Sequence, residues 1–245
     1  MAKYPTGTAF AYCHGFLSGP TSSKGRFLGS FLASRGASEL SLLALNGPTG
    51  EPAALSHSGA LQAIDDHWQA TQHQTPGARL CLIGSSFGGW AAAAYASRHP
   101  SRVSRLLLLC PGFELAHRWE AIVGGSEALA QWERDGERSF LMPHTRAPVS
   151  IPWRLAADSM SLAPEVAAPL VRCPTTIVHG LHDDVVPLEV SRRFAARSKP
   201  FARLVAVDDD HWLCQPATLQ RIADVAAELF ELPPGSTDRT ALWSP

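Results

Sequence analysis

Gly84-Ser85-Ser86-Phe87-Gly88 is the stretch from which the fold can be predicted. It matches the pattern G-x-S-x-G, which by itself is common in a chain with 19 glycines. Its surroundings are more informative: residues 79–83 form an apolar run of strand length, and alanine-rich, helix-like sequence follows Phe87. A serine on a glycine-flanked strand-to-helix turn is held in a strained conformation with its hydroxyl exposed above the sheet. We therefore predict that Ser86 is a nucleophile, while Ser85 points away; an ordinary loop of small residues is the alternative.

The strand-to-helix pattern recurs along the chain. Short apolar runs alternate with longer amphipathic segments, and most runs are apolar at successive positions, as in strands buried on both faces. This alternation predicts an α/β fold with a mostly parallel sheet of about six strands and helices on both faces. The predicted strands are 8–13, 39–45, 79–83, 103–110, 175–179 and 203–207; the predicted helices are 22–34, 53–74, 87–98, 188–197 and 216–230.

A serine nucleophile needs a base and an orienting acid, and the elbow fold places them after the serine in the order acid, histidine. His211 follows the last predicted strand and is our predicted base. Asp183 follows the strand before it and is the predicted acid, which would hold the imidazole in the required tautomer. We choose Asp183 over Asp184, which we interpret as a loop or helix-capping residue. A surface histidine, or a capping role for both aspartates, is the alternative.

The predicted oxyanion hole consists of two backbone N–H groups. One belongs to Phe87, the residue after the nucleophile, and the other to Phe16, in the loop after the first strand. Gly15 lets that loop bend, and we interpret His14 as a structural residue that braces it. His182 and Asp183 have no further ligand at metal-like spacing, so we expect no metal.

Residues 113–164 interrupt the alternation and contain no convincing strand. We predict a small, partly helical insertion, or lid, over the carboxyl ends of the strands, within a single domain of residues 1–231. Residues 232–245 are predicted to be a flexible tail. Leu17, Trp153 and Trp212 are the predicted substrate-pocket residues. The alternative is that the lid tryptophans only pack the lid onto the core.

Composition and charge exclude several function classes. The net charge of −1 does not suggest a nucleic-acid partner, whose binding usually needs a basic patch. The apolar runs are too short to span a bilayer, and no apolar segment after Lys3 suggests a secretory signal. Five widely spaced cysteines favour free thiols in a reducing compartment. We expect a cytoplasmic monomer or homodimer that acts on a small molecule, with no membrane association and no cofactor.

In order, four segments resemble the α/β-hydrolase superfamily: His14-Gly15-Phe16, residues 84–90, residues 180–187, and Asp210-His211. Residues 84–90 and 179–187 are similar to small bacterial serine esterases and to abhydrolase-domain enzymes that act as palmitoyl-protein thioesterase and acyl-glucuronide esterase. The resemblance implies the α/β-hydrolase fold with a small helical lid. The family's first two strands are missing here, so the implied strand order is 4-3-5-6-7-8 in the family's numbering.

We therefore expect a serine hydrolase that cleaves a carboxylic ester or thioester through an acyl-enzyme on Ser86. The same three residues could instead cleave an amide or a carbon–carbon bond. A dehalogenase is disfavoured because that chemistry on this fold needs an aspartate where Ser86 stands. A non-catalytic scaffold of the same fold is the remaining alternative.

Overall fold

Six parallel strands form the central sheet of the computed structural model, which describes residues 7–47, 50–142 and 145–234. Their order across the sheet is β2-β1-β3-β4-β7-β8. In the family's numbering this is the predicted order, so both the strand number and the order are confirmed. The strands are β1 (Thr8–Cys13), β2 (Leu40–Leu43), β3 (Arg79–Ser85), β4 (Val103–Leu109), β7 (Thr175–Gly180) and β8 (Ala202–Val207).

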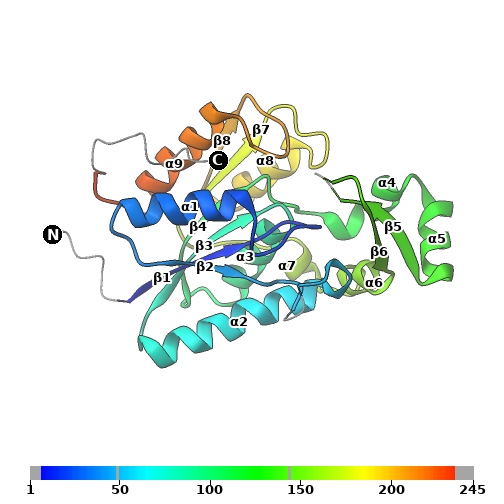
Figure 1. The fold of residues 1–245 in the computed structure, drawn as a ribbon, viewed down its shortest axis with the longest axis horizontal. Helices are drawn as coiled ribbons and strands as arrows, with labels where there is room; N and C mark the ends of the chain where they lie inside the picture. The colour runs from blue at the N-terminus through cyan, green and yellow to red at the C-terminus, as the bar shows by residue number, and fades with distance from the viewer. Residues whose placement is uncertain (1–6, 48–49, 143–144, 235–245) are drawn as a thin grey trace.

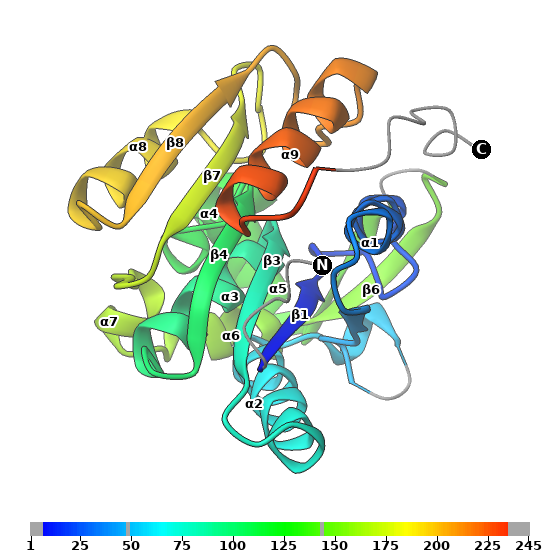
Figure 2. The same ribbon diagram turned by 90° about the vertical axis from the view of Figure 1, so that its left-hand side faces the viewer.

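Helices cover both faces of the sheet, as predicted (Figures 1 and 2). One face is covered by α1 (Ser23–Ser34) and α9 (Pro216–Leu229). The other is covered by α2 (His57–Gln74), α3 (Phe87–Arg98) and α8 (Leu188–Arg197). A short 3-10 helix, η1 (Pro52–Ala54), precedes α2.

Strand β3 shows why the predicted strands were continuously apolar. Leu80 and Leu82 pack into the core on the α2, α3 and α8 side, whereas Cys81 and Ile83 pack into the core on the α1 and α9 side. All four are buried because a central parallel strand has no solvent-facing side. The strand is thus held by hydrophobic burial on both faces at the point where it delivers Ser86.

The insertion between β4 and β7 lies beyond the carboxyl ends of the strands (Figure 1). It contains helices, as predicted, but also a two-stranded antiparallel sheet, so the prediction that it has no strand is wrong. Its elements are η2 (Leu115–His117), α4 (Trp119–Val123), α5 (Ser126–Asp135), β5 (Glu137–Leu141), β6 (Pro148–Pro152), α6 (Arg154–Met160) and α7 (Pro164–Ala167).

The hairpin is hard to find in the sequence because its strands are short and mostly exposed or half-buried. In β5 exposed residues alternate with half-buried ones, and β6 begins and ends with proline. Proline is tolerated in a two-stranded ribbon, where each strand has a free edge. Phe140 pairs with Val149 across the hairpin, so the apolar side of the ribbon is small.

An aromatic cluster holds the insertion together. Trp132 lies at its centre, with ring centroids 5.3 Å from Trp119, 5.5 Å from Trp153 and 5.4 Å from Phe140. The indole N–H of Trp132 donates to the carbonyl of Ile151 at 2.9 Å, which satisfies its one polar group in the core. The cluster is continuous with the core on the α2, α3 and α8 side of the sheet, so it also packs the insertion onto the rest of the domain.

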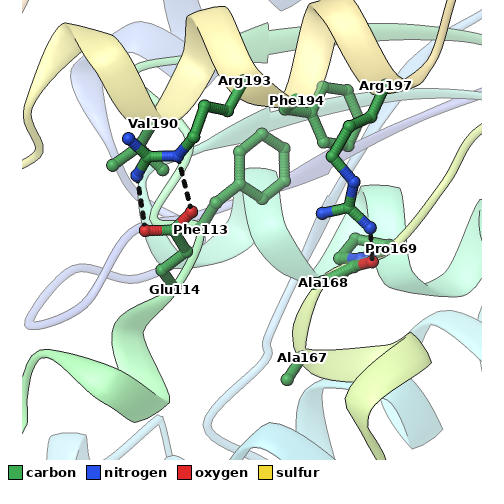
Figure 3. A pocket seen from close by; sticks show the side chains of 9 residues that line it. All are labelled: Phe113, Glu114, Ala167, Ala168, Pro169, Val190, Arg193, Phe194 and Arg197. Carbon is green, nitrogen blue, oxygen red and sulfur yellow. Dashed lines mark hydrogen bonds and ion pairs between the residues drawn. The ribbon is translucent and has the colours of Figure 1, made fainter.

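Both ends of the insertion are fastened to α8 (Figure 3). At the first end, Arg193 binds the Glu114 carboxylate at 2.7 and 3.3 Å, and Phe113 stacks on Phe194 with centroids 4.2 Å apart. At the second end, Arg197 donates to the carbonyl of Ala168 at 3.3 Å. The insertion thus leaves and rejoins the core at one helix.

The remaining sequence predictions concern termini, cysteines and membranes. The predicted tail begins at Leu232, whose backbone N–H donates to Ala227, while residues 235–245 lie outside the described residues. All five cysteines are unpaired, as predicted. Within the described ranges, no helix combines the length and apolar character needed to cross a bilayer.

Two glycines of the predicted turn are required by close backbone packing. A Cβ atom on Gly88 would overlap the carbonyl groups of Cys13 and His14, and one on Gly84 would overlap the backbone of Gly88. Helix α3 therefore lies against β1 and β3 without side chains between them. This contact fixes the start of α3 relative to the sheet.

We expect Gly88→Ala to destabilise the fold by about 3 kcal/mol or more, because backbone atoms on both sides would have to shift. Gly29→Ala in α1 is the matched control: its Cβ would lie 3.8 Å from Leu40 Cβ, in ordinary contact. It should stabilise the protein by about 0.5–1 kcal/mol, because alanine loses less entropy in a helix. Urea unfolding of both variants tests this; equal stabilities would contradict it.

Candidate active site

Ser86 lies on a strained turn between β3 and α3, with φ +51° and ψ −118°. Few residues other than glycine adopt positive φ, and here neighbouring strands impose it. The Ser86 N–H donates to Leu109 in β4 at 2.8 Å, and the Ser86 carbonyl accepts from Gly89 at 2.9 Å and Gly112 at 2.8 Å. These bonds hold the turn so that the hydroxyl projects from the sheet edge.

His211 follows β8 and reaches Ser86. Its Nε2 lies 3.1 Å from Ser86 Oγ, and its side chain is buried. The loop is shaped by Asp209, whose two carboxylate oxygens accept the backbone N–H groups of Asp210 at 2.8 Å and Gln215 at 3.0 Å. The loop also packs closely on Gly180, where a Cβ would overlap the carbonyls of Asp209 and Asp210.

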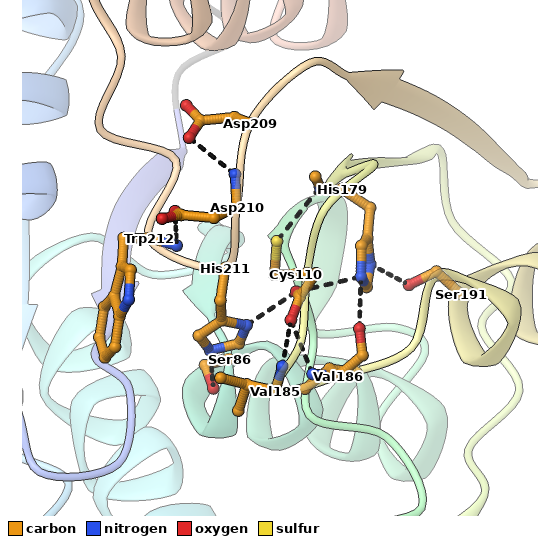
Figure 4. A network of polar contacts seen from close by, with 12 residues as sticks. Ser86, Cys110, His179, Val185, Val186, Ser191, Asp209, Asp210, His211 and Trp212 are labelled. Carbon is orange, nitrogen blue, oxygen red and sulfur yellow. Dashed lines mark hydrogen bonds and ion pairs between the residues drawn. The ribbon is translucent and has the colours of Figure 1, made fainter.

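Asp183 lies on the far side of the His211 ring. Its Oδ2 accepts from His211 Nδ1 at 2.8 Å, and its Oδ1 accepts the N–H groups of Val185 at 2.9 Å and Val186 at 2.7 Å. Figure 4 shows His211 between Ser86 and this loop. Asp183 thus both shapes its own loop and orients the imidazole. Asp184 is exposed, and it is not the α8 cap, because that position is Pro187.

A second histidine, His179, also contacts the acid and was not identified from the sequence. Its Nε2 lies 3.2 Å from Asp183 Oδ2 and 2.9 Å from the Val186 carbonyl, and its Nδ1 lies 2.8 Å from Ser191 Oγ. Carbonyl and ionised carboxylate oxygens only accept, so Nε2 carries the hydrogen. The available signal was a histidine in an otherwise apolar strand, four residues before the acid.

These contacts decide the charge of Asp183. Burial of the side chain raises its pKa, but hydrogen bonds from His179 and His211 outweigh burial and bring the pKa well below the usual aspartate range. The carboxylate is therefore ionised at neutral pH and can stabilise a positive charge on His211.

The thiol of Cys110 lies close to Asp183 and His211. Among the described residues, Cys110, Asp183 and His211 form the one group of three potential metal ligands whose ligand atoms lie within 4.8 Å of one another. Burial, and then the charge of Asp183, raise the pKa of the Cys110 thiol. A metal ion at this group would have to displace the thiol proton.

The loop after β1 runs beside the serine. A Cβ on Gly15 would lie only 3.3 Å from Ser86 Cβ. His14 braces the loop: its Nδ1 donates to the Gly15 carbonyl at 2.9 Å, and its Nε2 accepts the Leu45 N–H at 3.2 Å. Within the described part of the chain, no acceptor engages the backbone N–H of Phe16 or Phe87. Both predicted oxyanion donors are therefore available to a ligand.

Ser86 and His211 open into a cleft of about 920 Å³. Of the predicted pocket residues, Leu17 and Trp212 line this cleft, whereas Trp153 is not among its described lining residues and packs against Trp132. Apolar residues are exposed at the rim: Leu141 (49%), Val185 (42%) and Trp212 (37%).

The chain belongs to the alpha/beta hydrolase fold family, whose model matches residues 13–149. It is similar to 2-hydroxymuconate semialdehyde hydrolase from Pseudomonas sp. (strain CF600), with 28% identity over 139 residues, 46% of this chain and 49% of that protein. It is also similar to 2-hydroxy-6-oxo-2,4-heptadienoate hydrolase from Pseudomonas putida (strain F1), with 29% identity over 159 residues, 55% of this chain and 58% of that protein. The chain thus spans about half the length of these curated relatives.

Among solved structures, the alpha/beta hydrolase domain-containing protein 10 from mouse superposes with a TM-score of 0.71. The match covers 94% of this chain and 91% of the mouse chain at 19% sequence identity. At that identity the likeness shows the fold alone.

The lowered pKa of Asp183 predicts how stability depends on pH. Above the ordinary aspartate pKa of about 3.9 the ionised form stabilises the folded state, and this stabilisation is lost as the pH falls through the lower folded-state pKa. We expect Asp183→Asn to destabilise the protein most at pH 7, with the difference from wild type shrinking below pH about 4. Urea unfolding at several pH values measures it, with exposed Asp184→Asn as control. A pH-independent difference would contradict the prediction.

Proposed function

We propose that this chain is a serine hydrolase that cleaves a carboxylic ester or thioester through an acyl-enzyme on Ser86. The observation that carries the proposal is the continuous run of hydrogen bonds from Ser86 through His211 to Asp183 at the edge of the cleft. A serine, a base and an orienting acid in this relation are the requirements for nucleophilic acyl transfer.

In the first half-reaction, His211 Nε2 takes the hydroxyl proton as Ser86 Oγ attacks the acyl carbonyl. The carbonyl electron pair moves to oxygen, and the N–H groups of Phe16 and Phe87 stabilise the resulting negative charge. When the tetrahedral intermediate collapses, the bond to the leaving oxygen or sulfur breaks. The leaving group takes the proton from His211, and the acyl group remains on Ser86.

In the second half-reaction, His211 takes a proton from water, which attacks the acyl-enzyme carbonyl. The same two N–H groups hold the oxyanion. Collapse breaks the bond to Ser86 Oγ, which recovers its proton from His211, and the carboxylic acid is released. In both halves Asp183 stays ionised and stabilises the imidazolium; the low pKa of its carboxyl supports this role.

The cleft supports a small-molecule substrate. Its volume of about 920 Å³ is ample for one, and the apolar rim at Leu141, Val185 and Trp212 suits an acyl chain. We place the reaction in the cytoplasm, a proposal supported by the five free thiols. We treat residues 1–231 as one catalytic domain that acts as a monomer or homodimer.

Carbon–carbon bond hydrolysis is the second candidate. The compounds in the names of the two Pseudomonas relatives, a semialdehyde and an oxo-dienoate, contain no ester or thioester. The same serine, histidine and aspartate could serve such a reaction in this chain. We rank it second because the aligned region covers about half of each relative.

Ser86→Ala should lower kcat/KM for a p-nitrophenyl ester by at least about 10⁴-fold and abolish labelling by a fluorophosphonate probe, because no nucleophile remains. Ser85→Ala is the matched control: it removes the neighbouring hydroxyl and should keep the labelling. Circular dichroism checks that both variants are folded. Substantial hydrolysis by Ser86→Ala would refute the nucleophile, and an unlabelled wild-type protein would favour a non-catalytic scaffold.

Steady-state assays can separate the two candidate reactions. The panel contains p-nitrophenyl esters with acyl chains of graded length, acyl-CoA thioesters and 2-hydroxymuconate semialdehyde. We expect the best ester or thioester to exceed the semialdehyde in kcat/KM by at least about a hundredfold, about 2.7 kcal/mol of transition-state stabilisation. The reverse order would favour carbon–carbon cleavage.

A further inference from the structure

The cleft beside Ser86 contains more positive than negative charge. Three cationic side chains line it, those of Lys24, Arg26 and Arg146, against the single carboxylate of Glu51. The whole chain has a net charge of −1, so the excess is local to the cleft and does not follow from a basic composition.

Lys24 lies closest to the catalytic loops. It stands in the first turn of α1, and its Nζ donates to the carbonyl of Trp212, the residue after His211. Partial burial lowers its pKa, while nearby groups, among them Asp209 and Asp210, favour the charged form. An ammonium has three N–H donors, and the Trp212 carbonyl occupies one, so two remain for a ligand.

The two arginines come from separate parts of the fold. Arg26 belongs to α1, and Arg146 belongs to the loop of the β5–β6 hairpin in the insertion. Among the described residues, no acidic side chain lies within 4.0 Å of the cationic atoms of Lys24, Arg26 or Arg146. Within the described residues, the core and the insertion thus both contribute cationic side chains without an ion-pair partner to one cleft.

Isolated surface lysines and arginines usually indicate no more than a solvated face. Here the arrangement differs in two respects. All three side chains line the cleft that holds the proposed nucleophile, and the lysine is fixed to the base loop by a backbone carbonyl. Charged groups of one sign in a concave site raise the local concentration of an oppositely charged substrate.

We propose that the substrate is an ester or thioester whose leaving group bears an anion, either a carboxylate or a phosphate. This inference rests on the proposed function. We place the leaving group beside Lys24 because that group takes its proton from His211, and Lys24 is bonded to Trp212, the next residue of the same loop. Lys24 binds the anion, and Arg26 and Arg146 attract it at the opening.

Matched substrate pairs test the proposal, and the first two pairs share a butanoyl group. The first pair is 4-(butanoyloxy)benzoate and its methyl ester, which differ in one negative charge. The second is S-butanoyl-4′-phosphopantetheine and S-butanoylpantetheine, which differ in one phosphate. A third pair, 4-nitrophenyl hydrogen adipate and its methyl ester, places the charge on the acyl side. Each kcat/KM is divided by the second-order rate constant for hydrolysis of the same substrate by hydroxide. This division removes differences in intrinsic reactivity between substrates.

We expect the anionic member of the first or second pair to be favoured by about tenfold, and the preference to shrink at high salt. A preference in the first pair indicates a carboxylate, and one in the second a phosphate. Arg26→Gln and Arg146→Gln should each lower the ratio by about two- to fivefold, as for exposed ion pairs, and Lys24→Gln by more. Arg192→Gln, at an exposed arginine of α8, is the matched control and should leave the ratio unchanged.

Hydrolysis of the neutral esters with no anion preference in the first two pairs, or with a preference in the adipate pair alone, would overturn this inference and leave the proposed function intact. Absence of both ester hydrolysis and fluorophosphonate labelling would overturn the proposed function and this inference together. If Lys24→Gln does not fold, the two arginine variants decide the outcome, because both side chains are on exposed residues.

Discussion

Backbone packing at two glycines determines where the side chains of the candidate site can lie. At Gly88, helix α3 approaches β1 so closely that no side chain fits between them. At Gly180, the end of β7 approaches the loop of Asp209 and Asp210 equally closely. Such contacts leave little freedom for adjustment, because protein interiors are close-packed. Main-chain contacts thus hold Ser86 beside the loop after β1 and Asp183 beside His211. Motion of side chains does not change these main-chain distances.

The backbone packing also places the hydrogen-bond donors that surround the charge of Asp183. His179 and His211 both approach the same carboxylate oxygen of Asp183, while the other oxygen is occupied by two backbone N–H groups. A buried carboxylate with this many donors is ionised without a metal or a lysine partner. Arg118, which donates to the Val185 carbonyl, is a further cation whose charge interacts with Asp183. Lys24, Arg26 and Arg146 instead line the cleft.

The sequence was sufficient for the sheet and for the residues at its carboxyl edge. Ser86, Asp183 and His211 each follow a strand, so the parallel topology alone brings them to one edge. The β5–β6 hairpin was missed because its strands are short and half exposed, and hydrophobic periodicity is weak in such segments. His179 was missed because its partners, Ser191 and Val186, follow it on the next loop and helix. Only the folded path of that segment shows that they face the same ring.

The attachment of the insertion to the core has a consequence for how the insertion can be exchanged. Glu114 and Ala168, at its two ends, are fastened to α8. Between them, Asp158 accepts from the Ser58 N–H in α2, and the Val166 carbonyl accepts from the Trp90 indole in α3. The segment from Leu115 to Ala167 is therefore tied to three helices of the core, and a replacement would have to keep contacts with all three. Because Phe140 of the insertion also packs on Phe16, with ring centroids 5.6 Å apart, exchange of the segment would change the surroundings of the candidate site together with the lining of the cleft.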